Sequence, residues 1–237
     1  MQTKDRVAVL TGAGSGIGRA LANALARTGC NLALADLNSD SLAETAAQAR
    51  ALGVRVSEHP LDVSDRAAVA ALPAAVIAEH GNVEILINNA GVALGGNFDE
   101  VSTENFDWLM SINFDAVVTM CRAFLPLLKQ RPEARIVNIS SLFGLITPAG
   151  QTAYCASKFA VRGFSNALRL ELLDSNVGVT VVHPGGVATS IATSARSSEN
   201  VSEADKQKKL ERAKRLLRMP PPKAAQIILN GIERNKA

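Results

Sequence analysis

The sequence lacks several features that mark exported, membrane-spanning and disulfide-rich proteins. Its three cysteines, Cys30, Cys121 and Cys155, are odd in number and do not have the spacing of metal ligands. We therefore expect reduced packing residues and no metal site. No run of about 18 apolar residues is present, and no basic segment followed by an apolar one opens the chain. These absences predict a soluble, cytoplasmic protein without stable membrane insertion.

Aromatic residues are also scarce, at 4%, and no charge of one sign extends along the chain. The net charge of +3 arises within residues 203–218, which hold seven basic and three acidic residues and no aromatic one. Without interleaved aromatic side chains, nucleic-acid binding is disfavoured. With 47% apolar and 20% charged residues over 237 positions, the chain can bury the core of one large α/β domain.

A glycine-rich turn lies between the first predicted strand and the first predicted helix. The apolar run 7–10 ends at Thr11. Four glycines come next, Gly12, Gly14, Gly16 and Gly18, and an Ala/Leu-rich helical segment then extends to about residue 28. Glycines at this place let the backbone approach a pyrophosphate, which the helix N-terminus then stabilises. The spacing differs from Gly-x-Gly-x-x-Gly, and a simple tight turn is the alternative. The position in a first βα unit nevertheless favours dinucleotide binding.

A carboxylate follows the second predicted strand. Asp36 stands at the end of the run 32–35, 18 residues beyond Gly18. A carboxylate there accepts hydrogen bonds from the ribose hydroxyls of NAD and repels the 2′-phosphate of NADP. The next residue is Leu37 and not an arginine, so NAD is predicted over NADP. Capping of the helix that starts near Ser39 is the alternative role for Asp36.

Strands and helices alternate along the rest of the chain. Further strands are predicted at 54–59, 84–87, 136–139 and 177–182, and helices at 39–52, up to 80, at 106–129, from 154 to about 173 and at 222–235. This alternation predicts a single α/β domain over residues 1–237, built as a Rossmann-type doubly wound parallel sheet with helices on both faces. Pro73 is expected to kink its helix or to mark the beginning of it.

Polar or small residues follow the predicted strands, at the carboxyl edge where open α/β sheets bind ligands. The sequence Asn88-Asn89-Ala90-Gly91 joins two amides to a small flexible pair, which suits either a close crossing over a ligand or the locking of neighbouring strands. The residues placed at this edge are Thr11, Asp36, Asp62, Asn89, Ser141 and Gly185.

A hydroxyl, a phenol and an ammonium converge on one part of this edge. Ser141 follows a β-rich run, whereas Tyr154 and Lys158 are four residues apart and share one face of a long helix. A close positive charge stabilises a phenolate, so Lys158 is expected to lower the pKa of Tyr154 toward the range useful for general acid/base catalysis. The alternative is an ordinary buried tyrosine beside a solvated lysine, which a bare Tyr-x-x-x-Lys would favour.

One more polar residue interrupts an apolar helix face. Asn113 follows Leu109 and precedes Val117 at helical spacing. If it is buried, its amide must be hydrogen-bonded. A solvated or self-satisfied amide is the alternative.

Taken together, these motifs resemble those of the short-chain dehydrogenase/reductase family, from residue 7 to about 189 and more loosely beyond. The resemblance depends on order and spacing, including the position of Ser141, 13 residues before Tyr154. The motifs are Thr11-Gly12-x-x-x-Gly16-x-Gly18, Asn88-Asn89-Ala90-Gly91, Asn113, Ser141, Tyr154-x-x-x-Lys158 and Pro184-Gly185. Family members continue past the last helix into a seventh strand, for which this sequence has no counterpart before Ala237.

The resemblance implies a role for each matched residue. Tyr154 would exchange a proton with the substrate oxygen, and Ser141 would hydrogen-bond that oxygen. Lys158 would bind the nicotinamide ribose and lower the Tyr154 pKa, while the backbone of Asn113 would hold a water of a proton relay. The implied cofactor-binding residues are Gly12, Ser15, Gly16, Ile17, Gly18, Asp36, Asp62, Val63, Asn89, Tyr154, Lys158, Val187 and Thr189. Of these, Asp62 and Val63 would contact the adenine, Asn89 the adjacent ribose region, and Val187 with Thr189 the carboxamide of the nicotinamide. The family also implies a homodimer or homotetramer built partly from the helices that contain Phe106 and Tyr154.

The segment 190–219 has helical spacing of leucines among charged residues. A mobile substrate lid is favoured over a solvated helix face, and binding to a membrane surface or nucleic acid is a weaker alternative. The predicted pocket wall is apolar and suggests an uncharged hydrophobic alcohol or ketone, although core packing would explain the same residues. They are Leu94, Phe98, Leu142, Phe143, Leu145, Ile146 and Ile191.

The sequence therefore predicts an NAD-dependent oxidoreductase that interconverts a secondary alcohol and a ketone, with Tyr154 as general acid/base. A non-catalytic NAD(H)-binding sensor is one alternative, since fold alone never proves catalysis. An epimerase or dehydratase on the same scaffold is another.

Overall fold

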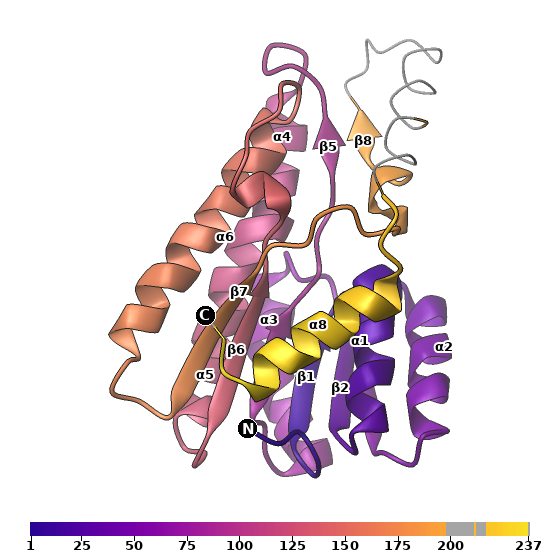
Figure 1. Cartoon of the computed structure of the whole chain (residues 1–237), viewed down its shortest axis with the longest axis vertical. Coiled ribbons are helices and arrows are strands. Elements are labelled where there is room, and N and C mark those ends of the chain that lie inside the picture. Colours follow the sequence, from indigo (N-terminus) through magenta and orange to yellow (C-terminus); the bar gives the residue numbers. More distant parts are fainter. Residues whose placement is uncertain (198–210, 212–216, 237) are drawn as a thin grey trace.

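The computed structural model describes residues 1–197, 211 and 217–236. Its main sheet has six strands, all parallel, in the order β3-β2-β1-β4-β6-β7. The strands are β1 (Val7–Thr11), β2 (Asn31–Asp36), β3 (Val56–Pro60), β4 (Ile85–Asn88), β6 (Ala134–Ile139) and β7 (Val177–Val182). This order, with helices on both faces (Figure 1), confirms the predicted single Rossmann-type domain.

Helices cover the two faces of the sheet and create two hydrophobic cores. One face carries α1 (Gly16–Arg27), α2 (Ser39–Arg50) and α8 (Pro221–Glu233), with α8 beside α1 in Figure 1. The other carries α3 (Arg66–His80), α5 (Ala116–Leu128) and α6 (Thr152–Glu171). Alternate residues of β1 point into opposite cores, since Val7 and Val9 pack into one and Ala8 and Leu10 into the other. Burial on both faces explains why these strands are continuous apolar runs.

The helix predicted at 106–129 begins earlier and contains an irregular turn. The helix α4 (Thr103–Met110), a π-helical turn η1 (Ser111–Asp115) and α5 follow one another without a break. By length and composition, residues 103–128 could cross a membrane, although a core helix passes the same test. Leu109, Val117 and Phe124 on its inner face are buried, which fits a core helix.

Two sequence expectations about α3 and the cysteines have clear outcomes. The expectation that Pro73 marks the beginning of its helix is wrong, because α3 starts at Arg66 and Pro73 lies inside it. The Asp65 carboxylate accepts hydrogen bonds from two backbone N–H groups of the first turn and so fixes the start seven residues earlier. All three cysteines are free and buried, and burial raises the pKa of Cys30 and of Cys121 to about 12.

A second, two-stranded sheet was not predicted. Strand β5 (Leu94–Gly95) pairs in parallel with β8 (Arg196–Ser197). The guanidinium carbon of Arg196 lies 3.6 Å from the centroid of the Trp108 ring, and its Nη1 donates to the Asn105 Oδ1 at 3.1 Å. Of the predicted lid at 190–219, residues 198–210 and 212–216 lie outside the described part. Its far end returns to the domain at Met219, whose backbone exchanges hydrogen bonds with Gly186 and Ala188.

The amino edge of the sheet is joined by a buried carboxylate. Glu84 is 1% exposed, and its Oε2 accepts from the Val7 N–H at 2.9 Å. Its Oε1 accepts from Nε and Nη2 of Arg131, each at 2.8 Å. The Glu84 backbone also bonds to Val7 and to Arg135. One residue thus ties the starts of β1, β4 and β6 together.

Replacing Glu84 by alanine should lower the free energy of unfolding by about 2–3 kcal/mol, because it leaves the Val7 N–H and the Arg131 guanidinium without this acceptor. Urea unfolding followed by circular dichroism measures the change. Glu58→Ala is the matched control, since Glu58 pairs with Arg50 at the surface and should lose less than about 1 kcal/mol. Equal losses in the two variants would contradict the role given to Glu84.

Candidate functional site

The carboxyl ends of β1 and β4 are locked by two polar side chains. The Thr11 hydroxyl accepts hydrogen bonds from the backbone N–H groups of Asn89 (3.0 Å) and Ala90 (3.1 Å). In return, the Asn89 amide donates to the backbone carbonyls of Thr11 and Gly12, both at 3.0 Å. Of the two roles expected for the Asn-Asn-Ala-Gly run, the structure shows strand locking. The contact of Asn89 with a ribose stays a prediction.

The glycine turn is packed too closely for side chains. Gly12 has φ +64°, and a Cβ there would lie 2.8 Å from the Ala90 Cα. Gly16 has φ +51°, and its Cβ would lie 3.1 Å from the Thr189 methyl carbon. Gly16 lies in the turn predicted to bind the pyrophosphate, and Thr189 is predicted to bind the carboxamide. The two residues are therefore neighbours across this turn.

The first turn of α1 follows the glycine turn and lacks a side-chain cap from its N-cap residue. Ser15 is exposed and is the N-cap, but its side chain makes no capping hydrogen bond. The following Ile17 packs against the core on the α1 side, and Gly18 is buried against the Gly12 carbonyl, where a Cβ would overlap it. Because Ser15 does not cap this helix start, the N–H groups of the first turn can donate to an anion.

Asp36 stands at the end of β2 and faces the glycine turn. Its Oδ2 accepts from the Gly14 N–H at 2.8 Å, and its Oδ1 accepts from the Asn38 N–H at 2.9 Å. The helix cap is Asn38 and not Asp36, because the Asn38 Oδ1 accepts from the Ser41 N–H. The alternative role of Asp36 as the cap of α2 is therefore wrong.

Asp62 and Val63 follow β3 and lie farther along the same edge. The exposed Asp62 carboxylate accepts from the backbone N–H (2.9 Å) and the hydroxyl (2.6 Å) of Ser64. Val63 is buried and lines a small pocket together with Thr11, Ala90 and Ile112. The structure thus brings Val63 close to the locked ends of β1 and β4, while Asp62 stays at the rim.

Asn113 lies in the π-helical turn and is fully engaged. Its Oδ1 accepts from the Val92 N–H at 2.8 Å, and its Nδ2 donates to the Val92 carbonyl (3.0 Å) and the Ser157 hydroxyl (3.2 Å). It is 1% exposed, so the alternative of a solvated amide is wrong. A π-turn widens the helix locally and is frequent at functional sites. Asn113 binds the loop after β4 to α6.

Ser141, Tyr154 and Lys158 converge as predicted. Ser141 follows β6, and its hydroxyl accepts from the Phe143 N–H at 3.1 Å, which starts the 3₁₀ turn η2 (Leu142–Gly144). Lys158 is 3% exposed, and its Nζ donates to the Ile139 carbonyl at 3.1 Å and lies 5.7 Å from the centroid of the Tyr154 ring. A Cβ on Gly91 would lie 3.5 Å from this Nζ and 3.2 Å from the Asn113 Oδ1. Gly91, from the Asn-Asn-Ala-Gly run, therefore lies beside both Asn113 and Lys158 of the Tyr-x-x-x-Lys motif.

The expected direction of the Tyr154 pKa shift is wrong. Burial raises the pKa of Tyr154 above its ordinary value, and the Ser141 side chain opposes that rise without cancelling it. Burial also lowers the pKa of Lys158 to about 8, because a buried ammonium loses hydration. Lys158 therefore releases its proton before the phenol ionises. The attraction between the two groups favours a lower Tyr154 pKa, but both groups also lose hydration on burial, and for Tyr154 that loss has the larger effect.

Some residues of the predicted apolar wall pack near Tyr154 or Gly185, and others are exposed. Phe143 packs edge-on against Tyr154, with ring centroids 6.1 Å apart, and Leu94 belongs to the same buried cluster as Tyr154. Leu142 lies against Gly185. Phe98 is 70% exposed, and Leu145 and Ile146 are also exposed, whereas Ile191 is half-buried. The exposed members do not belong to the packed core.

Sequence reasoning missed residues that position the predicted ones. Ser140 donates to the Lys158 carbonyl at 2.8 Å, and Ser157 donates to the Tyr154 carbonyl at 2.8 Å. Asn88 and Asn138 bond at 2.8 Å across β4 and β6, and Asn138 also donates to Ser165. Serines at 157 and 165 fall on the buried face of α6 at helical spacing. A polar residue on an apolar face, the signal used for Asn113, would have found them.

The chain contains one tyrosine, so the phenolate absorbance in an alkaline titration reports Tyr154 alone. Because burial disfavours the charged form, the midpoint should lie above about 10 in the absence of added nucleotide. Tyr154→Phe supplies the baseline, since it should show no phenolate transition. A midpoint below about 10 would contradict the assigned direction.

Comparison with known proteins agrees with this geometry. A family model described as short chain dehydrogenase matches residues 6–200. The Mycobacterium tuberculosis protein named "Putative oxidoreductase SadH" is 45% identical over 236 residues, which cover 99% of this chain and 85% of that protein. A short chain dehydrogenase/reductase from Burkholderia phymatum, solved in complex with NAD, superposes with a TM-score of 0.91 at 34% identity, covering 100% of this chain and 88% of the other. A metagenomic short-chain oxidoreductase solved in complex with NADP superposes with a TM-score of 0.74 at 34% identity, covering 78% of this chain and 84% of the other.

The match of the family model over most of the chain, the identity to SadH and the superposition on the Burkholderia structure give one conclusion. The chain belongs to the short-chain dehydrogenase/reductase family of oxidoreductases.

Proposed function

We propose that the protein is an NAD-dependent oxidoreductase that interconverts a secondary alcohol and a ketone. The observation that carries the proposal is the meeting of Ser141, Tyr154 and Lys158 at the carboxyl edge of the sheet, beside Gly91 and the buried Asn113. In open α/β sheets, ligands bind at this edge where the strand order reverses, which here lies between β1 and β4.

The residues of this group divide the proton chemistry among them. Tyr154 exchanges a proton with the substrate oxygen as general acid/base, and the Ser141 hydroxyl hydrogen-bonds the same oxygen. Lys158, held by the Ile139 carbonyl, supplies a positive charge below its pKa of about 8. A bound nicotinamide would supply the hydride acceptor or donor. Asn113 acts through the position it gives to the loop at Val92 and to α6.

The residues around the glycine turn fit a dinucleotide. Gly12 and Gly16 have positive φ values and lie where a Cβ would crowd Ala90 or Thr189, so the turn has no side chains at these positions. The start of α1, which Ser15 does not cap, offers N–H groups to a pyrophosphate. Asp36 already accepts two backbone hydrogen bonds. A carboxylate has about four acceptor positions, so it can still receive two ribose hydroxyls. Val63 and Asp62 would contact the adenine, and Val187 and Thr189 the carboxamide.

NAD is proposed over NADP because of Asp36. Relatives of this family bind one or the other, as the Burkholderia and metagenomic structures show for those proteins. A carboxylate at the end of β2 repels a 2′-phosphate, and the neighbouring Leu37, which is 71% exposed, offers no compensating charge.

Exposed apolar residues that follow Ser141 support an uncharged, apolar substrate. Leu142, Leu145 and Ile146 follow Ser141 in the chain and are exposed, and Phe143 between them packs against the Tyr154 ring. The segment 190–219 remains a proposed lid, now with described anchors at β8 and Met219. A homodimer or homotetramer also remains a proposal, supported by the exposed apolar residues Leu170 and Leu173 at the end of α6.

Tyr154→Phe should reduce NADH formation from secondary alcohols by at least about 10²-fold, because phenylalanine lacks the phenol proposed to exchange the proton with the substrate oxygen. A panel of apolar secondary alcohols with NAD, followed by NADH absorbance, provides the assay. Cys155→Ala is the matched control at the neighbouring buried position. Undiminished turnover by Tyr154→Phe would remove the mechanism, and tight NADH binding without turnover of any alcohol would favour a sensor.

Asp36→Ala should lower the preference for NAD over NADP, measured as the ratio of the two kcat/KM values, by about 10- to 100-fold, the range expected for hydrogen bonds to a charged group. Both the attraction to the ribose hydroxyls and the repulsion of the phosphate are lost. Asp40→Ala, on the exposed first turn of α2, controls for the loss of one negative charge nearby. A wild-type protein that prefers NADP would contradict the cofactor assignment.

A further inference from the structure

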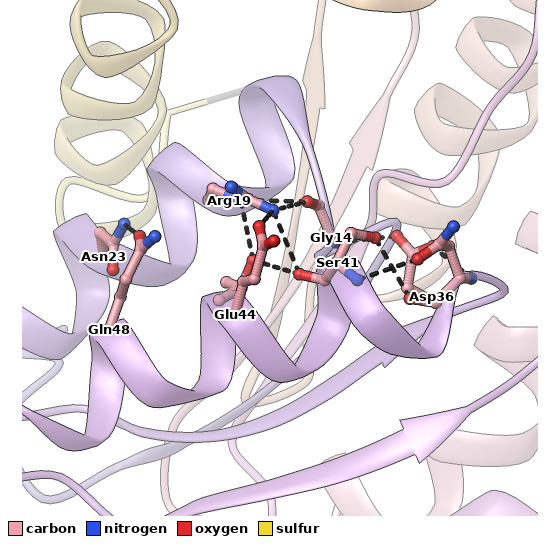
Figure 2. Close-up of polar contacts among 9 residues, drawn as sticks. Gly14, Arg19, Asn23, Asp36, Ser41, Glu44 and Gln48 are labelled. Carbon is pink, nitrogen blue, oxygen red and sulfur yellow. Dashed lines mark hydrogen bonds and ion pairs between the residues drawn. The ribbon is translucent and has the colours of Figure 1, made fainter.

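Arg19, in the first turns of α1, is the centre of a polar cluster that the proposed function does not use. Its Nε and Nη2 both donate to the Gly14 carbonyl, at 3.0 and 2.7 Å. Its Nη2 also donates to the Ser41 carbonyl at 3.2 Å, and its Nε to the Thr45 hydroxyl at 3.0 Å. Figure 2 shows the side chain reaching from α1 to the glycine turn and to α2 together.

These contacts close a ring of hydrogen bonds that passes through Asp36. Arg19 holds the carbonyl of Gly14, and the N–H of Gly14 donates to the Asp36 Oδ2. The Asp36 Oδ1 accepts from the Asn38 N–H, and the Asn38 side chain accepts from the Ser41 N–H. The Ser41 carbonyl accepts from Arg19, which completes the ring.

The ring leaves little freedom to the carboxylate. The Gly14 peptide is held on one side by Arg19 and on the other by Asp36. A Cβ at Gly14 would overlap the Ser41 hydroxyl, so α2 already lies against the turn without a gap. If Arg19 were removed, the Gly14 carbonyl and the Ser41 carbonyl would both lose their shared donor, and the turn and α2 could separate.

We infer that Arg19 is a positioning residue for cofactor selectivity, which fixes the glycine turn and the start of α2 so that Asp36 faces the adenosine ribose. The inference deepens the proposed function and rests on it. The Arg19 pair with Glu44 (2.8 Å) adds little, because the Glu44 side chain is 64% exposed. The fork of donors on two carbonyls is the feature that matters, and a lysine cannot reproduce it.

The test compares Arg19→Ala, Arg19→Lys and Asn23→Ala with the wild type. Asn23→Ala is the matched control, because the Asn23 Nδ2 joins α1 to α2 through the Gln48 Oε1 at 2.8 Å, one turn beyond Arg19 and outside the ring. Dissociation constants for NADH and NADPH come from nicotinamide fluorescence titrations, and kcat and KM for NAD are measured beside them.

Arg19→Ala should raise the dissociation constant of NADH about tenfold, the loss of roughly one charge-assisted hydrogen bond, and should lower the NADH-over-NADPH preference by a similar factor. The kcat at saturating NAD should change by less than about twofold, since Tyr154 and Lys158 are not part of the ring. Arg19→Lys should lie nearer to Arg19→Ala than to the wild type. Asn23→Ala should keep the wild-type preference.

Three results would overturn the inference while the proposed function stands. They are an unchanged preference in Arg19→Ala, an equal loss of preference in Asn23→Ala, and full wild-type behaviour of Arg19→Lys, which would show that the positive charge alone suffices. If Arg19→Ala does not fold, Arg19→Lys and Asn23→Ala still decide between these outcomes. A wild-type protein that binds neither NADH nor NADPH would instead overturn the proposed function itself.

Discussion

The site depends on how the chain satisfies its backbone where β1 and β4 separate. Beyond the last paired residues of these strands, N–H and C=O groups have no strand partner, and burying them unpaired would be costly. Thr11 and Asn89 provide the missing partners through four hydrogen bonds. The two strand ends are thereby fixed at the point where the strand order reverses. The glycine turn and the loop leading to Gly91 both start from this fixed point.

Side chains hydrogen-bonded to backbone groups also hold the loops on both sides of this point. On the α1 side, side chains of Arg19 and Asp36 hold the Gly14 peptide. On the α6 side, Asn113 holds both polar groups of Val92, and Ser140 and Ser157 hold carbonyls of α6. Polar side chains bonded to backbone leave their positions few alternatives, so the loops that would contact a ligand are preorganised.

Burial gives the candidate acid/base group its character. Enclosing Tyr154 and Lys158 shifts both toward their neutral forms, with the Tyr154 pKa raised and the Lys158 pKa lowered to about 8. The phenol therefore keeps its proton at neutral pH, and the lysine remains largely charged there. Burial of Tyr154 outweighs the Ser141 hydrogen bond, which favours the phenolate, so the neutral ring is the stable form at neutral pH.

The sequence by itself determined the six main strands, their helices and the edge on which the site residues gather. Apolar runs alternating with amphipathic segments leave few other arrangements, and parallel strands place their carboxyl ends together. Only the tertiary structure decided the π-turn at Asn113, the pairing of β5 with β8, the ring through Arg19 and the direction of the Tyr154 pKa shift. Strands β5 and β8 are about a hundred residues apart in the chain, the ring joins α1 to α2, and Asn113 in the π-turn bonds to α6. The direction of the pKa shift depends on desolvation, which is set by every element packed around the phenol and so cannot be read from two residues four positions apart.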